Sequence, residues 1–226
     1  MKSVSRVALL LAALVPALAL AHGVAGGDAA YVASSRGVNV FPFMYLGAKH
    51  MVTGYDHLLF LAGVIFFLYR LKDVALYVTL FAIGHSTTLL AGVLGGIHAN
   101  AYIVDAIIGL SVAYKAFENL GGFRRLGWQL DTRAAVLGFG FVHGFGLATK
   151  LQELSLSPDG LAANLVSFNV GVELGQLAAL GIILLAFNFW RRSRTFLSGA
   201  WTANVLIMAA GFVLIGYQLA GYWRGA

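Results

Sequence analysis

The chain has 226 residues, of which 60% are hydrophobic and 11% charged, and its mean hydropathy is +0.83. This composition is typical of an integral membrane protein and excludes an ordinary soluble domain. The net charge is +6, but the basic residues are placed in short connecting segments, so we expect no nucleic-acid partner. Cysteine is absent, which excludes disulfides, thiolate metal ligands and iron–sulfur clusters.

Residues 1–21 have the pattern of a secretory signal peptide, with a basic start, an apolar stretch and a small-residue cleavage site at Ala19-Leu20-Ala21. The alternative is an uncleaved first helix, but Pro16 interrupts an apolar stretch of only about 14 residues, which is short for a span. Cleavage would expose His22 as the mature N-terminus. Its free amine and imidazole are then a candidate metal chelate at the outer surface.

Hydropathy predicts an all-α fold: a polytopic membrane bundle of six transmembrane helices, after the signal peptide and a periplasmic lead-in of residues 22–42. The six spans form one domain, residues 43–226, and are expected at 43–69, 74–95, 101–120, 134–152, 161–189 and 200–222.

Charge in the connections predicts the orientation. Eight basic residues lie on one side of the expected bundle: Arg70, Lys72, Arg124, Arg125, Arg133, Arg191, Arg192 and Arg194. By the positive-inside rule this side is cytoplasmic. Both termini of the mature chain are then periplasmic, and we expect a multi-pass protein of the bacterial inner membrane.

Ionisable side chains recur near the middle of four expected spans, at His57, His85, His143 and Glu173. Each costs about 2.5 to 3.5 kcal/mol at mid-bilayer, so they should face partners or a water-filled cavity. Because they share one depth, we expect them to converge on one site. The alternative is that each histidine makes only a local contact between two helices.

Further ligand candidates flank these groups. Asp56 precedes His57, and Asn169 and Gln176 share one helical face with Glu173 through i, i+4, i+7 spacing. Imidazole, carboxylate and amide ligands suit a divalent transition metal, and nickel, cobalt, copper and zinc all remain open.

His50 and His57 share a helical face, but seven residues of straight helix would separate their Cα atoms by about 10.5 Å. We therefore expect two successive stations, with His50 the outer one. The alternative is that Gly54 marks an unwound turn that brings the two rings together. Lys115 with Glu118 is expected to form a local i, i+3 pair, and Asp105 either caps or pairs at the interface or lines a vestibule.

Four motifs on separate expected spans carry a family resemblance: GYDHLLFL (54–61), FAIGHSTTL (81–89), FVHGFGLA (141–148) and FNVGVELGQ (168–176). In this order they resemble the HupE/UreJ family of small membrane proteins, named for hydrogenase and urease accessory roles. The resemblance covers nearly the whole mature chain and implies a permease-like role in nickel or cobalt uptake. It carries Asp56, His57 and His143 over as functional residues.

Two positions depart from the nickel-linked pattern of the family. Lys49-His50 stands where a His-Pro pair is expected, and the FVHGFGLA motif has one histidine where that pattern often has two. The chain is more similar to a second branch, marked by the FNVGVELGQ stretch.

The sequence therefore predicts a protein that transports or binds a divalent transition metal at the bilayer midplane and is not an enzyme. No ATP-binding loop of the G-x-x-x-x-G-K-[ST] type is present. The expected partners are the metal ion and the lipid bilayer, with a second copy of the chain or a metallochaperone as candidates. The alternatives are a haem-binding or other redox membrane protein, and a non-transporting accessory subunit of a metalloenzyme maturation system.

Overall fold

The computed structural model describes residues 26–154 and 156–225, and the elements in these ranges are all helices. They are α2 (Gly26–Ser34), α3 (Val40–Thr53), α4 (Tyr55–Ile65), α5 (Leu71–Leu94), α6 (Ala101–Asn119), α7 (Gly122–Arg125), α8 (Thr132–Gln152), α9 (Leu161–Arg191) and α10 (Phe196–Arg224). The predicted all-α fold is confirmed for this part of the chain. The expected signal peptide and His22 lie outside the described residues.

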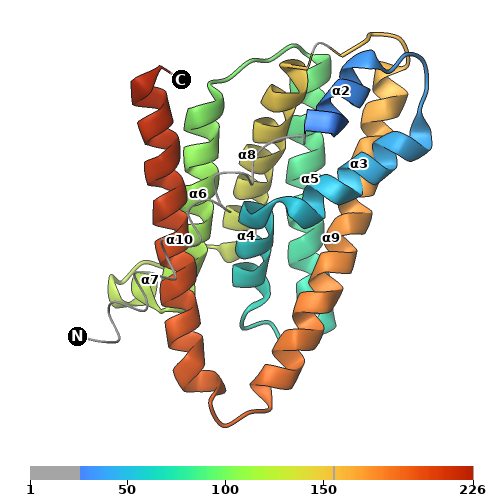
Figure 1. Ribbon diagram of the computed structural model, residues 1–226. Helices are drawn as coiled ribbons and strands as arrows, with labels where there is room; N and C mark the ends of the chain where they lie inside the picture. The colour runs from blue at the N-terminus through green and yellow to red at the C-terminus, as the bar shows by residue number, and fades with distance from the viewer. Residues whose placement is uncertain (1–25, 155, 226) are drawn as a thin grey trace.

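Four helices, α5, α8, α9 and α10, are long and apolar enough to cross a membrane. They lie in one bundle with α6 and with the broken helix formed by α3 and α4 (Figure 1). Each expected span coincides with a helix, and the first is divided between α3 and α4. The expected lead-in contains α2, and α3 begins within it at Val40.

Helices that are distant in the sequence pack as three close pairs: α3 with α9, α5 with α8, and α6 with α10. Glycine allows each close approach. A Cβ atom built on Gly84, Gly175 or Gly211 would lie 2.6 to 2.7 Å from a backbone atom of the facing helix. Small residues at such positions are the usual means by which membrane helices pack closely. The bundle is therefore three tight pairs of helices.

The short helix α4 lies in the middle of the bundle, in contact with α5, α6, α9 and α10 (Figure 1). At its C-terminal end, Arg191 of α9 donates hydrogen bonds to the carbonyl oxygens of Ile65 and Phe66, each at 2.7 Å. The Ile65 carbonyl oxygen also accepts from the Leu68 N–H at 3.0 Å, so Arg191 adds a side-chain donor to the last carbonyls of the helix. The same guanidinium lies over the Tyr69 ring, 4.6 Å from its centroid. Arg191 therefore attaches the end of α4 to the end of α9.

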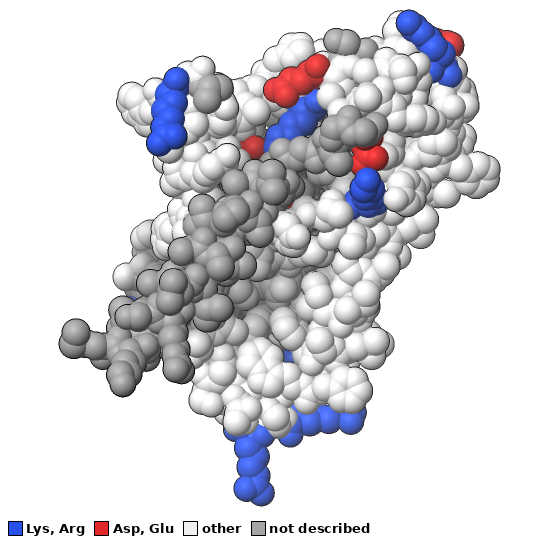
Figure 2. Space-filling model, in the orientation of Figure 1, with Lys and Arg blue, Asp and Glu red and all other residues white. Residues whose placement is uncertain are grey.

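The two ends of the bundle differ in charge. The α4–α5, α6–α8 and α9–α10 connections share the end drawn lowest in Figure 1, which we call the lower end. They and the adjoining helix ends carry the eight basic residues that the sequence assigns to one side. In Figure 2 the charged side chains visible at the lower end are Lys and Arg, whereas both acidic and basic side chains are visible in the upper half. The expected clustering of basic residues at one end is confirmed.

Candidate metal centre

A break between α3 and α4 creates the centre of the site. Gly54 has φ −75° and ψ 93°, which is extended backbone, so the helix stops at Thr53 and restarts at Tyr55. The restart places Asp56 in the first turn of α4, where the helix dipole stabilises an acidic side chain. Interrupted helices of this kind form substrate sites at mid-depth in many transporters, because the unwound backbone is tolerated where it faces a cavity or packed protein.

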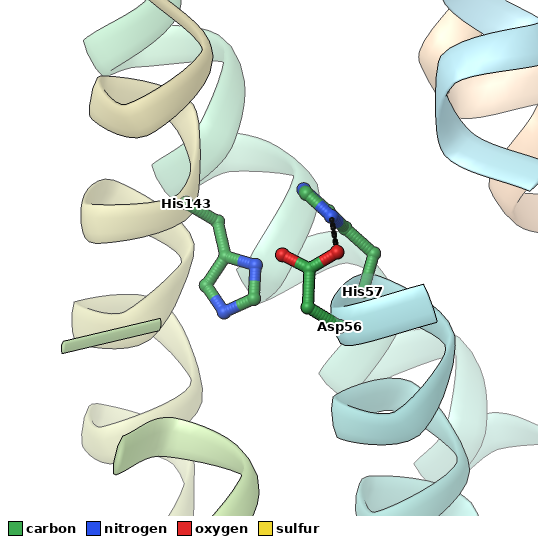
Figure 3. Close-up of side chains that lie close together, drawn as sticks. All are labelled: Asp56, His57 and His143. Carbon is green, nitrogen blue, oxygen red and sulfur yellow. Dashed lines mark hydrogen bonds and ion pairs between the residues drawn. The ribbon is translucent and has the colours of Figure 1, made fainter. Parts of the chain in front are cut away.

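Asp56, His57 and His143 form the one group of three or more His, Asp or Glu side chains with metal-site spacing in the described part of the chain (Figure 3). One ligand atom from each lies within 4.8 Å of the others. His57 Nδ1 is 3.1 Å from Asp56 Oδ1, and the His57 and His143 ring centroids are 4.7 Å apart. All three side chains are at most 2% exposed. Helices α4 and α8 thus direct two imidazoles and a carboxylate to one buried point.

Ser111 of α6 holds the far side of the His143 ring. Its hydroxyl lies 2.7 Å from the carbonyl oxygen of Ile108 and 3.0 Å from His143 Nε2. A hydroxyl has one proton, so a Ser111 that donates to Ile108 accepts from an Nε2–H group on His143. The other ring nitrogen, Nδ1, faces Asp56 (Figure 3). The sequence reasoning missed Ser111, although its position near the middle of an expected span was a usable signal.

Two more imidazoles lie beside His57. The His50 ring is 5.4 Å and the His85 ring 5.9 Å from the His57 ring, measured between centroids. His85 is 1% exposed, and neither of its ring nitrogens has a hydrogen-bond partner among the described residues. The expectation of two separate stations assumed one straight helix, with about 10.5 Å between the two Cα atoms, and the structure has the alternative, a break at Gly54. The unwound turn at Gly54 is what brings the two rings together.

Aromatic rings close the site on its lower side. Three phenylalanines each lie one helical turn below a histidine. Phe60 follows His57 by three residues, Phe81 precedes His85 by four, and Phe139 precedes His143 by four. The Phe60 ring is 5.5 Å from Phe81 and 5.7 Å from Phe139, and both Phe60 and Phe81 lie within 5.3 Å of the His143 ring. Phe60 and Phe81 are at most 1% exposed. We call these three rings the aromatic layer.

The upper side of the site is polar. Asp105 of α6 and Lys150 of α8 form an ion pair of 2.8 Å, and Asp105 is 4% exposed. Asp105 therefore pairs, which was one of the expected alternatives. Lys49 of α3 pairs with Asp28 of α2 at 2.7 Å. Polar groups thus lie above the site and aromatic rings lie below it.

The remaining candidates on α9 are not part of the group. Glu173 is exposed and lies in a groove between α5 and α9, with Ser86 Oγ 3.5 Å from its carboxylate. Gln176 is 1% exposed and donates to the Val78 carbonyl oxygen at 3.4 Å. Asn169 is 8% exposed, and its Oδ1 has no hydrogen-bond partner among the described residues. The structure therefore brings Asp56, His57 and His143 together and turns Glu173 to the outside.

Elsewhere, the local pair expected from spacing is confirmed, since Lys115 Nζ lies 2.5 Å from Glu118 Oε2. This pair sits on α6 below Ser111, at the lower end of the bundle.

Comparison with known proteins identifies the family of the chain. A family model described as "HupE / UreJ protein" matches residues 27–225. The match covers nearly the whole chain, so the chain belongs to the HupE/UreJ family. No curated protein and no solved structure matches it.

Proposed function

We propose that this member of the HupE/UreJ family carries a divalent transition-metal ion across the bacterial inner membrane, through the site formed by Asp56, His57 and His143. The single observation that carries the proposal is the convergence of two imidazoles and a carboxylate within 4.8 Å in the buried centre of an apolar bundle. Ionisable groups are costly at this depth and are expected there mainly for a function.

The donor chemistry supports a borderline metal. Two imidazole nitrogens and one carboxylate oxygen suit Ni²⁺, Co²⁺, Cu²⁺ or Zn²⁺ better than Mg²⁺ or Ca²⁺, which prefer oxygen ligands. The contact with Ser111 supports the same assignment, because donation of Nε2–H to the hydroxyl leaves the Nδ1 lone pair of His143 on the side of Asp56. Metal-binding histidines are usually held by such a second hydrogen bond. His85 and His50 are the nearest further ligands.

The two sides of the site support uptake from the upper end. A cation approaching from above meets the ion pairs Asp105–Lys150 and Asp28–Lys49, whereas the aromatic layer separates the site from the lower end. We infer that α3 with α4 forms one crossing and α6 another, which makes six with the four long apolar helices. The basic lower end is then cytoplasmic and both termini are periplasmic. Uptake would run from the periplasm inward.

We infer that the protein is not an enzyme. The two alternative functions, a redox protein and a non-transporting accessory subunit, can be tested with the purified protein and with the cells that produce it. A redox protein with haem would show a visible absorption band once purified. Phe60 and Phe81 occupy the space beside His143 that a porphyrin would need, so we expect no band. An accessory subunit without transport activity would bind metal but would not increase the metal content of cells.

The test compares three alanine variants, His57→Ala, His143→Ala and His98→Ala, in cells supplied in turn with Ni²⁺, Co²⁺, Cu²⁺ and Zn²⁺. His98 is an exposed histidine of the α5–α6 connection and is the matched control. We expect the first two variants to lose metal accumulation while their amounts in the membrane stay normal. His98→Ala should behave as the unaltered protein does. The purified protein should also gain about 2.7 kcal/mol of stability at a metal concentration of 100 Kd, and His57→Ala should gain none.

Unchanged accumulation in both His57→Ala and His143→Ala would refute the proposed site. Binding without accumulation, lost in the same two variants, would instead support the accessory function. The metal that competes best against the others in uptake would identify the physiological ion.

A further inference from the structure

A groove on the side of the bundle contains an acidic residue that the central site does not use. Glu173 projects from α9 into a groove of about 420 Å³ between α5 and α9. It is 12 residues from the start of α9, or about 18 Å from the upper end, so it lies well inside the hydrocarbon zone. On the same helix, the neighbouring Val170, Leu174 and Leu177 are 44%, 51% and 60% exposed, as expected for a lipid-facing surface. An ionised carboxylate on such a surface needs a cationic or hydrogen-bonding partner.

The polar lining of the groove consists of oxygen-bearing side chains. Thr79, Ser86 and Thr87 of α5 face Glu173 and Gln176 of α9. The Gln176 amide nitrogen is directed to the Val78 carbonyl oxygen at 3.4 Å, which leaves the amide oxygen as an acceptor. Glu173 is the one charged side chain among the described residues that line the groove. Carboxylate, hydroxyl and amide oxygens suit a small hard cation, in contrast to the imidazoles of the central site.

The groove also has room for a hydrated ion. Ser86 Oγ and the nearer Glu173 oxygen are 3.5 Å apart, which is the long limit of a hydrogen bond. A water molecule occupies about 30 Å³ in the liquid, so a groove of this size holds several. A cation between α5 and α9 would therefore be held by side-chain oxygens and water.

The groove lies where two of the close helix pairs meet. α5 is packed tightly on α8, and α9 on α3, through the glycine contacts described above. The groove separates these two pairs, so an ion bound across it changes how they sit against each other. Ser86 faces the groove, and the adjacent His85 lies 5.9 Å from His57 in the central site, again between ring centroids. α5 is thus a common wall of the groove and of the central site.

We propose that the groove around Glu173 is a second cation site, which takes the monovalent hard cation, a proton or Na⁺, whose gradient drives metal movement. This inference rests on the proposed transport function and adds the driving ion to it. The Glu173 carboxylate holds the cation together with Ser86 and the neighbouring hydroxyls. Binding and release there shift α5 and, through His85, the metal site.

The experiment uses the purified full chain in lipid vesicles with Ni²⁺ as the probe. One arm applies a proton gradient in Na⁺-free buffer, and the other applies a Na⁺ gradient at equal pH on both sides. The key variant is Glu173→Gln, with Glu153→Gln, an exposed residue at the end of α8, as the matched control. We expect one of the two gradients to drive accumulation in the unaltered protein and in the control. Glu173→Gln should lose this accumulation but keep Ni²⁺ binding and Ni²⁺–Ni²⁺ exchange. Ser86→Ala should reduce gradient-driven accumulation without changing binding.

Each other outcome overturns the inference in a recognisable way. Normal gradient-driven accumulation in Glu173→Gln would show that the groove does not bind the driving cation. Loss of Ni²⁺ binding in Glu173→Gln, equal to that in His57→Ala, would make Glu173 part of the metal site. A changed oligomeric state with normal coupling would make the groove an interface between copies. Ni²⁺ exchange that responds to neither gradient would end the coupling idea but leave the proposed function intact. Failure of the proposed function differs from all of these, since the unaltered protein would then not exchange Ni²⁺ across the vesicle membrane, whether or not it binds the ion.

Discussion

The central cluster and the α5–α9 groove lie at similar depth but are built in opposite ways. In the cluster, Asp56, His57 and His143 are at most 2% exposed and are surrounded by protein on every side. In the groove, Glu173 is exposed and its neighbours are hydroxyl and amide groups. The imidazole donors are enclosed by protein together with one carboxylate, whereas the donors of the groove are all oxygens on an open face of the bundle.

This difference teaches that depth in the bundle does not determine the role of an ionisable residue. Its neighbours decide which ion it suits. The cluster offers the softer ligands that borderline transition metals favour, whereas the groove offers the ligands of a hard cation. Three substitutions, one in the cluster and two at residues that contact it, test this distinction and are taken from the largest expected effect to the smallest.

Asp56→Asn removes the one carboxylate of the cluster and keeps its shape. We expect metal affinity to fall by more than about 100-fold, because loss of a direct ligand should exceed the 10- to 100-fold cost of losing an outer partner. Calorimetric titration of the purified protein measures the effect, with the exposed Asp159→Asn as the control. If Asp56→Asn cost no more affinity than Glu173→Gln, the distinction between the two regions would disappear.

Gly54→Ala adds a methyl group at the break between α3 and α4. The backbone there, at φ −75°, is open to any residue, so strain is not the cause of the effect. The new Cβ would lie 3.0 Å from His57 Nδ1 and 3.3 Å from Asp56 Oδ1, and it should displace both groups. We expect affinity to fall by about 10- to 100-fold, by analogy with the loss of a partner that orients a ligand.

The matched control for this change is Gly138→Ala, because a Cβ at Gly138 meets no atom within 4 Å. It should leave metal titrations unchanged. Equal affinities for Gly54→Ala and Gly138→Ala would mean that the cluster tolerates displacement of its ligands.

Ser111→Ala removes the partner of His143 Nε2 and should have the smallest effect. All direct ligands remain, but the ring loses the hydrogen bond that fixes its orientation, so we expect affinity to fall by about tenfold. Ser167→Ala is the control, because the Ser167 hydroxyl bonds only to a carbonyl of its own helix. Identical titrations for the two serine variants would show that Ser111 does not orient the metal ligand.

Much of the fold could be predicted from hydropathy alone. The apolar segments correspond to helices, and the basic connections share one end, because both features depend on local composition. The break at Gly54 was considered only as an alternative to a straight helix. Glycine is common throughout this chain, and no local signal separates the one that interrupts a helix from those that permit close packing.

The site was harder to predict. Counting residues along a span gives the depth of a side chain in the membrane but not the direction in which it points. Glu173 has the depth of the central histidines, yet α9 packs against α3 and turns this side chain toward a groove beside α5. The partner of a helix depends on glycine contacts such as Gly175 against α3, which join segments far apart in the sequence. The structure brings together Asp56, His57 and His143, and their role as metal ligands stays a prediction.

Arg191 anchors one end of the central half-helix. Its two hydrogen bonds tie the last carbonyls of α4 to the last residue of α9, so the lower end of α4 is anchored. At the upper end, the extended backbone of Gly54 connects α4 to α3, and the His50 and His57 rings lie side by side across this break. α4 is therefore fixed to α9 at its lower end, and its upper end begins at a backbone break that lies two residues before Asp56.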